Sequence, residues 1–351
     1  MMPDDAGGLL AVHAHPDDET LWTGGLLATW AAAGRRVTVV TCTRGERGEV
    51  IALPGTTSAG LAHLEGDGPA LGAYRERELA AAAAALGVDQ VFLDEIPRGP
   101  AQDGPAGRVG SLAPDGLSRY EDSGMRWVRP GVAGPAEDSP ASAFARVELD
   151  EPAGRLAGLL RELRPAVVVT YEPSGGYGHP DHIRAHDVTV RALRLLEESR
   201  GPASAGTGVA GAARPGPPEL WQAVVPAREL RAARRELARL DEARAVVVGH
   251  GLTLPDPDEA LPPYAREDLP GPSGGAAGGD RLERVEVAPV LDRVLAAMRA
   301  HATQVQHVTR APAPGMLGYY ALSNGVLAPL PRHETYLVSA PAGRPGRPPS
   351  R

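Results

Sequence analysis

Two short segments of the chain concentrate side chains that could do chemistry. HAHPDDE (13–19) follows the apolar run LLAV, and GHPDH (178–182) follows the apolar run VVVTY (167–171) and a glycine-rich turn. The imidazole and carboxylate groups of both segments are suited to binding a metal ion through nitrogen and oxygen. The single cysteine, Cys42, lies in another apolar run, so a disulfide framework and a cysteine-rich metal site are both excluded.

Two histidines and one carboxylate make a three-ligand site that leaves positions open for water and substrate, as in catalytic zinc sites. His15 and Asp18 are three residues apart at a predicted strand-to-helix turn and can converge on one ion, which His182 can complete. Asp17 then points elsewhere and is free to act as a general base. Zinc lowers the pKa of a bound water toward ~7 and polarises a carbonyl, which suits hydrolysis of an amide or ester. His179 could stabilise the oxyanion or protonate the departing amine.

Other interpretations stay open at these residues. Ferrous iron binds to the same kind of donor set, so the residue types do not decide the metal. Either segment alone could be a capped helix start, but two such segments after buried strands favour a metal site. His13 shares a face with His15 in a regular strand and is expected beneath the metal site or in a structural role. His186 follows His182 by one helical turn, a spacing typical of a packing or surface residue.

Apolar runs and helical segments alternate through the first half of the chain. The predicted strands are 9–14, 37–43, 91–96 and 167–171, and the predicted helices are about 19–34, 74–87, 151–164 and 180–198. This alternation predicts an α/β fold in which a mostly parallel sheet is covered by helices on both faces. Sites in such sheets form outside the carboxyl ends of the strands, where both segments lie. We therefore expect the two segments to meet there.

Loops and additions complete the predicted organisation. Segments rich in Gly, Pro or Ala are predicted to be loops within one domain, at 97–110, 201–218 and 270–279. A strand at 220–225 and a helix at 227–243 are predicted as additions to the core. We expect one domain over 1–340, with extra strands and helices toward its C-terminal end, and a disordered tail at 341–351.

Composition excludes several classes of function. The net charge of −8 argues against general attraction to nucleic acid or an anionic membrane, and no apolar run is long enough to span a bilayer. The chain has no lysine to serve as a nucleophile, and HPDDE after the first strand replaces the glycine-rich turn of a dehydrogenase. MMPDDAGG lacks the features of a signal peptide, so we expect a cytoplasmic protein. The oligomeric state is left open, a homo-oligomer included.

The two segments together resemble a known family. AHPDDE, followed by TCTRGERGEV and much later by GHPDH, is similar to the LmbE-like or PIG-L-like family of metal-dependent N-acetylglucosaminyl deacetylases. The resemblance implies a Rossmann-like fold with one zinc ion per subunit. It implies His15, Asp18 and His182 as the zinc ligands and Asp17 as the general base.

The resemblance also implies roles for residues outside the ligand set. Tyr177 and His179 match positions around the scissile amide and its oxyanion. Glu49, Arg75 and Asp122 match positions that contact sugar and inositol hydroxyls. Without the family, Arg75 would be interpreted as a solvated charge on a helix and Glu49 as a turn cap.

Segments farther along the chain favour one branch of the family. The segments YRERELAAAAAALGV, YEDSGM, HATQV and ALSNGVLAPLPRHETYLV are similar to deacetylases of mycothiol biosynthesis, which act on N-acetylglucosaminyl-inositol. The sister branch, the mycothiol S-conjugate amidases, has lysine near the position of Trp22 and proline in place of Gly178. The segment at 97–110 leaves substrate identity open, so another N-acetylglucosamine conjugate is an alternative. A non-catalytic sugar-binding module is disfavoured, because such a module would be expected to have lost a metal ligand or the base, and all of them are present.

Overall fold

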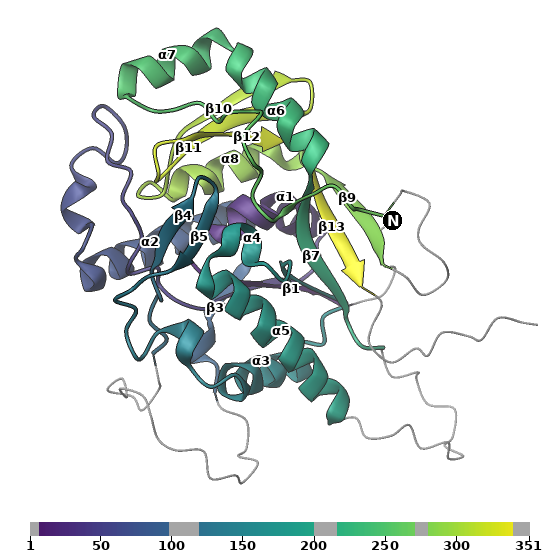
Figure 1. Ribbon diagram of the computed structural model, residues 1–351. Coiled ribbons are helices and arrows are strands. Elements are labelled where there is room, and N and C mark those ends of the chain that lie inside the picture. Colours follow the sequence, from purple (N-terminus) through teal and green to yellow (C-terminus); the bar gives the residue numbers. More distant parts are fainter. Residues whose placement is uncertain (1–6, 98–118, 200–215, 271–279, 340–351) are drawn as a thin grey trace, which may run out of the picture.

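The computed structural model (Figure 1) describes residues 7–97, 119–199, 216–270 and 280–339. The predicted loops and tail lie almost wholly outside the described residues, at 97–110, 201–218, 270–279 and 341–351. The single domain over 1–340 stays a prediction. Among the residues described, no helix is both long and apolar enough to cross a bilayer.

The N-terminal apolar runs form neighbouring parallel strands of one sheet. β1 (Leu9–His13) pairs with β2 (Val37–Thr41) on one side and with β6 (Val167–Tyr171) on the other. β3 (Asp89–Phe92) extends the sheet beyond β2, and β7 (Glu219–Pro226) extends it beyond β6, again in parallel. Every residue of β1, β2 and β6 is buried, as expected for strands that are covered on both faces.

The other end of the sheet is antiparallel. β13 (His333–Ser339) pairs with β7 and with β9 (Arg281–Glu286), and the short β8 (Ala265–Arg266) lies beside β7. The order is β3-β2-β1-β6-β7-β13-β9, so the extra C-terminal strands continue the central sheet. The prediction that 220–225 is an addition to the core is wrong. Its middle residues, 221–224, are buried and join the parallel half of the sheet to the antiparallel half.

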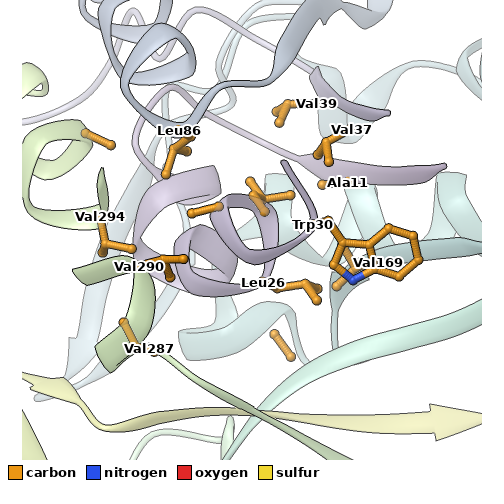
Figure 2. Packing of buried hydrophobic residues seen from close by; sticks show 14 of the residues in the cluster. Ala11, Leu26, Trp30, Val37, Val39, Leu86, Val169, Val287, Val290 and Val294 are labelled. Carbon is orange, nitrogen blue, oxygen red and sulfur yellow. The ribbon is translucent and has the colours of Figure 1, made fainter. Parts of the chain in front are cut away.

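Helices cover one face of the sheet through alternate strand residues. Three helices lie on this face (Figure 1): α1 (Asp18–Ala32), α2 (Gly68–Leu86) and α8 (Leu291–Ala300). Figure 2 shows strand residues such as Val39 and Val169 in one cluster with Leu26 and Trp30 of α1. Each such side chain stabilises the fold by about 1.5–3 kcal/mol when it is fully buried. This packing fixes α1, whose first residue belongs to the HPDDE segment.

The opposite face has its own cluster. It is covered by α3 (Asp150–Leu163) and α5 (Pro180–Glu198). Leu10 and Val12 of β1 point to this side, because successive side chains of a strand point to opposite faces, and they pack with residues of both helices. Helices on both faces of a mostly parallel sheet confirm the predicted α/β fold.

A smaller antiparallel sheet lies beside the central one. It consists of β10 (Val305–Ala313), β11 (Met316–Leu322) and β12 (Leu327–Pro331). Two helices pack on it, α6 (Ala227–Arg239) and α7 (Asp241–His250). The prediction of one helix over 227–243 is wrong, because Leu240 has an extended backbone with ψ of 119° and a new helix begins at Asp241.

The remaining elements are short. β4 (Met125–Arg129) and β5 (Val132–Pro135) form a hairpin, and the brief helix α4 (Gly175–Gly178) precedes α5. Single 3-10 turns occur at Leu61–Leu64, Leu93–Glu95, Phe144–Arg146 and Ala288–Val290. The predicted strand 91–96 ends early, at Phe92. The chain then turns at Leu93–Glu95, where the Asp94 carboxylate accepts hydrogen bonds from the Arg44 side chain and the Tyr120 backbone.

Candidate active site

The two chemical segments meet at the carboxyl ends of β1 and β6, as predicted. These strands are direct neighbours, and each is followed within a few residues by a helix that begins in the segment. The N–H of Ala14 donates a 2.9 Å hydrogen bond to the Tyr171 hydroxyl, which ties the two strand ends together. The sheet thus brings together side chains that are more than 150 residues apart in the chain.

His15, Asp18 and His182 form a triangle of donor atoms. Nδ1 of His15, Oδ2 of Asp18 and Nε2 of His182 are each 3.3 Å from the other two. The backbone N–H of His15 also donates a hydrogen bond to Oδ2 of Asp18 at 3.0 Å, which holds this carboxylate at the first turn of α1. Ligands about 2.0–2.1 Å from a tetrahedral zinc ion lie about 3.3–3.4 Å apart. All three side chains are buried, and their spacing fits three corners of such a site.

Two other groupings share His15. The first group consists of His15, His179 and His182, which each have a ring nitrogen within 4.8 Å of the other two. The second group consists of His15, Asp122 and Asp181, whose ligand atoms are equally close together. Oδ1 of Asp122 is 3.7 Å from His15 Nε2, and Asp181 already accepts two hydrogen bonds from Ser123. The triangle with Asp18 has three equal donor spacings of 3.3 Å.

Asp181 orients the His15 ring. Its Oδ2 lies 3.3 Å from Nε2 of His15, while its carboxylate also accepts the backbone N–H of Ser123 at 2.8 Å. A proton on Nε2 that points to this carboxylate leaves the Nδ1 lone pair free toward Asp18 and His182. No role for Asp181 was predicted from the sequence. The signal was its place directly before His182, because metal-bound imidazoles commonly donate to a carboxylate.

His179 has a defined tautomer. Its Nδ1 accepts a 3.1 Å hydrogen bond from the Asp181 N–H and caps α5, so the proton of the neutral ring is on Nε2. Burial, helped by the neighbouring His15 and His182, holds the pKa of His179 well below its usual range. His179 therefore offers the site a hydrogen-bond donor and remains uncharged at neutral pH.

Asp17 has an unusual backbone conformation and a raised pKa. Its φ of 114° and ψ of −33° are rare outside glycine and cost on the order of 1–3 kcal/mol. It precedes α1, yet its carboxylate makes no hydrogen bond that caps the helix. Burial raises the pKa of Asp17 to about 7, although Arg75, with Nη2 at 3.3 Å from Oδ1, opposes the shift. This carboxyl is suited to exchange protons near neutral pH.

Arg75 is a buried residue of α2 that binds the HPDDE segment through hydrogen bonds and an ion pair. Its guanidinium donates to the carbonyls of Pro16, at 2.5 Å, and Gly45, at 2.8 Å, besides its contact with Asp17. A Cβ at position 45 would collide with the guanidinium, and the φ of +66° there also favours glycine. The interpretation of Arg75 as a solvated helix charge does not hold.

Asp122 and Glu49 border the site in different ways. Asp122 is buried and accepts the N–H of Gly124 at 2.8 Å. Burial alone would raise the pKa of Asp122, but the positive charge that His15 carries when it is protonated outweighs burial and holds the pKa of Asp122 well below its usual range. Glu49 is half-buried, and its backbone carbonyl accepts a hydrogen bond from Gln304.

Aromatic rings pack around the His182 side of the site. The Tyr177 ring is 5.1 Å from the His182 ring and stacks on Trp127 of the β4–β5 hairpin at 5.7 Å. The turn that carries Tyr177 is held by Glu172, which accepts the N–H of Gly176 at 2.9 Å. Gly176 has a φ of +70°, and a Cβ there would strike the Trp22 ring. Trp22 therefore packs directly against this turn.

His13 and His186 have structural contacts. Nε2 of His13 lies 2.9 Å from the Thr23 hydroxyl, which donates its own proton to the Glu19 carbonyl, so His13 is the donor. Burial lowers the pKa of His13 to about 4 and keeps it neutral. His186 Nδ1 lies 2.9 Å from the Tyr171 carbonyl. Of the alternatives left open for these residues, the structural ones agree with these contacts.

Comparison with known proteins identifies the family. A family model described as PIG-L: GlcNAc-PI de-N-acetylase matches residues 10–193, a range that includes every predicted site residue. The chain belongs to this family. The resemblance seen in the HPDDE and GHPDH segments is therefore confirmed.

Relatives in the family match the chain over nearly its whole length. A protein of Kineococcus radiotolerans named 1D-myo-inositol 2-acetamido-2-deoxy-alpha-D-glucopyranoside deacetylase is 40% identical over 97% of this chain and 80% of its own. A protein of Rhodococcus erythropolis with the same name is 37% identical over 99% of this chain and 97% of its own. Among solved structures, a deacetylase–teicoplanin complex matches with a TM-score of 0.44 at 19% identity, covering 94% of this chain and 97% of that chain.

Proposed function

We propose that this chain is a metal-dependent N-deacetylase that removes acetate from 1D-myo-inositol 2-acetamido-2-deoxy-alpha-D-glucopyranoside in mycothiol biosynthesis. The substrate follows from the names of relatives that are about 40% identical over almost the entire chain. The observation that carries the chemistry is the triangle of His15, Asp18 and His182 with Asp17 beside it. Such a site is suited to hydrolysis of an amide by water.

We propose one zinc ion per subunit, held by His15, Asp18 and His182. Two nitrogens and one oxygen at 3.3 Å spacing suit tetrahedral zinc and leave a position for water or substrate. When bound, the metal supplies Lewis acidity toward the amide carbonyl and makes a water in the site more acidic. Ferrous iron is the alternative, because it accepts the same donor set.

Asp17 is the proposed general base. Its carboxylate takes a proton from the attacking water and returns it to the leaving amine as the C–N bond breaks, so one group serves both transfers. Arg75 holds one oxygen of Asp17 and limits its rotation. We assign the proton delivery to Asp17 and not to His179, because the low pKa of His179 leaves it neutral.

The oxyanion of the tetrahedral intermediate is stabilised by fixed hydrogen-bond donors in this proposal. His179 offers its Nε2–H, because Nδ1 is occupied by the Asp181 N–H. Tyr177 offers its hydroxyl from the same turn. Removing one such donor costs about 100- to 1000-fold in kcat in well-studied hydrolases. Glu49, Arg75 and Asp122 are proposed to contact the hydroxyls of the sugar and inositol rings.

The decisive experiment measures amine release from N-acetylglucosaminyl-inositol, beside a mycothiol S-conjugate, with metal-stripped protein before and after addition of zinc. Zinc-dependent release from the acetylated sugar alone is the expected result. Release from the conjugate alone would move the chain to the amidase branch. Activity on neither, or equal activity without metal, would overturn the proposal.

A further inference from the structure

The segment HATQ (301–304), directly after α8, contacts three parts of the site region. Nε2 of His301 lies 2.7 Å from Oε1 of Glu19, in the HPDDE segment. The Thr303 N–H and hydroxyl both donate to Glu78 of α2, at 2.8 and 2.7 Å. Gln304 donates to the Glu49 carbonyl. The proposed reaction gives none of these three side chains a role, although His301 and Thr303 are completely buried.

Glu19 connects His301 to Asp17. One carboxylate oxygen, Oε2, accepts the backbone N–H of Asp17 at 3.0 Å. The other, Oε1, accepts the Thr20 hydroxyl at 2.5 Å and faces Nε2 of His301. Since Glu19 is fully buried and its oxygen is an acceptor, the imidazole must supply the proton of the 2.7 Å contact. His301 therefore fixes the orientation of the carboxylate that holds the Asp17 backbone.

The Asp17 backbone needs such support because its conformation is unfavourable. A φ of 114° in an aspartate persists only when its surroundings hold it there. Arg75 holds the Asp17 side chain and the neighbouring Pro16 carbonyl. The Glu19 carboxylate holds the N–H from the other side. A relaxed backbone at this position would turn the Asp17 carboxylate away from its present direction.

We propose that His301 is a positioning residue that acts through Glu19 to keep the Asp17 backbone left-handed and its carboxylate aimed at the scissile amide. This inference rests on the proposed function, which makes Asp17 the base. The hydrogen-bond partner of the His301 side chain is Glu19, so its influence on Asp17 is indirect. Its loss should slow the chemical step while metal binding and substrate binding persist.

The test compares amide substitutions of different reach. Gln at 301 places an N–H near the position of Nε2, whereas Asn is too short to reach Glu19. For the zinc-loaded enzyme we expect H301A and H301N to lower kcat by about 10- to 100-fold, with KM and zinc content near wild type, and H301Q to recover most of the rate. The H301N and H301Q pair keeps the test valid if H301A does not fold.

Two controls separate positioning from general stability. T303V removes the two hydrogen bonds of the Thr303 hydroxyl, with Glu78 and with Gln304, without touching Glu19, and should keep the wild-type kcat. In a D17N background, H301N should cost nothing further, because both changes act on the same group. Equal losses in H301N and T303V, or a further loss in the D17N background, would overturn the inference.

A structural readout decides the inference independently of activity. In a crystal structure of H301N, Asp17 should leave its left-handed conformation or lose its N–H contact with Glu19. An unchanged Asp17 backbone would overturn the inference, even if the wild-type protein proved inactive toward the acetylated sugar. Inactivity of the wild type would overturn the proposed function alone.

Discussion

Oδ2 of Asp181 lies 3.3 Å from Nε2 of His15, on the side of the ring opposite the triangle of proposed ligands. This contact selects the tautomer that presents Nδ1 to a metal. D181N should therefore weaken zinc binding by about 10- to 100-fold, the usual effect of removing a carboxylate that orients a ligand. Competition with a chromogenic chelator measures the change. S123A, which removes only one donor to the same carboxylate, serves as the milder control, and equal zinc affinity in D181N and wild type would contradict the assignment.

The pH dependence of the reaction should follow Asp17. Burial raises its pKa from 3.8 to about 7, and a base works only when it is deprotonated, so kcat/KM should fall as the pH drops through this range. The midpoint is expected at or somewhat below 7, because a bound cation favours the carboxylate. D17N should lose about 100- to 10,000-fold in kcat and this acid limb, while zinc content stays unchanged. An acid limb that survives in D17N would assign the titration to another group.

Stability should depend on pH through Glu334, which has no role in the proposed reaction. Its carboxylate accepts the N–H groups of Gly25 and Leu26, inside α1, at 2.7 and 2.8 Å. Burial raises its pKa from 4.5 to about 7, so the folded state binds the proton more tightly than the unfolded state. This contribution to stability is fully present below about pH 4.5 and is lost as the pH rises through about 7.

E334Q removes this titration. The free energy of unfolding of wild type relative to E334Q should be larger at pH 5 than at pH 8, by on the order of a few kcal/mol. Urea denaturation at both pH values measures it, and the comparison of variants cancels the other titrating groups. A difference that does not change with pH would show that Glu334 does not titrate in this range.

The sequence predicted the parts of the fold that rest on local patterns. The strand 167–171 and the helix that begins at Pro180 were predicted with nearly the bounds that the structure has. The parallel pairing of β1 and β6 then brings His15 and His182 together. Side chains that act through distant contacts had no such signal. Glu19 meets His301 across 282 positions, and a lone buried histidine after a helix is chemically unremarkable until its partner is known.

The place of the later strands was equally hard to predict. The strand 220–225 was predicted as an addition to the core, and its own residues carry no signal for β13, which pairs with it and comes more than 100 residues later in the chain. Strand order is decided by such distant pairing and not by the apolar pattern of either strand alone. The β4–β5 hairpin gave no signal that Trp127 stacks on Tyr177, because that contact depends on the turn before α5.

Trp127 should influence catalysis through Tyr177. The two rings stack at 5.7 Å, and Trp127 remains 39% exposed. A stacked aromatic pair contributes about 0.5–1.5 kcal/mol, so W127A should lower kcat roughly 2- to 10-fold by loosening the tyrosine, with little change in Tm. W127F should keep most of the rate. In a Y177F background the loss should shrink, and an undiminished loss would mean that Trp127 contacts the substrate directly.

Metal should stabilise the fold through the triangle of proposed ligands. An ion that binds only the native state adds RT ln(1 + [L]/Kd), about 2.7 kcal/mol at 100 times Kd, which corresponds to a rise in Tm of roughly 3–5 °C for a chain of this size. Thermal unfolding of metal-stripped protein with graded zinc should show this rise, and ferrous iron under anaerobic conditions provides the comparison between metals. H182Q removes one ligand of the triangle and should abolish the shift, whereas H63Q, at an exposed histidine, should leave it intact. A zinc-dependent shift that persists in H182Q would place the stabilising ion elsewhere.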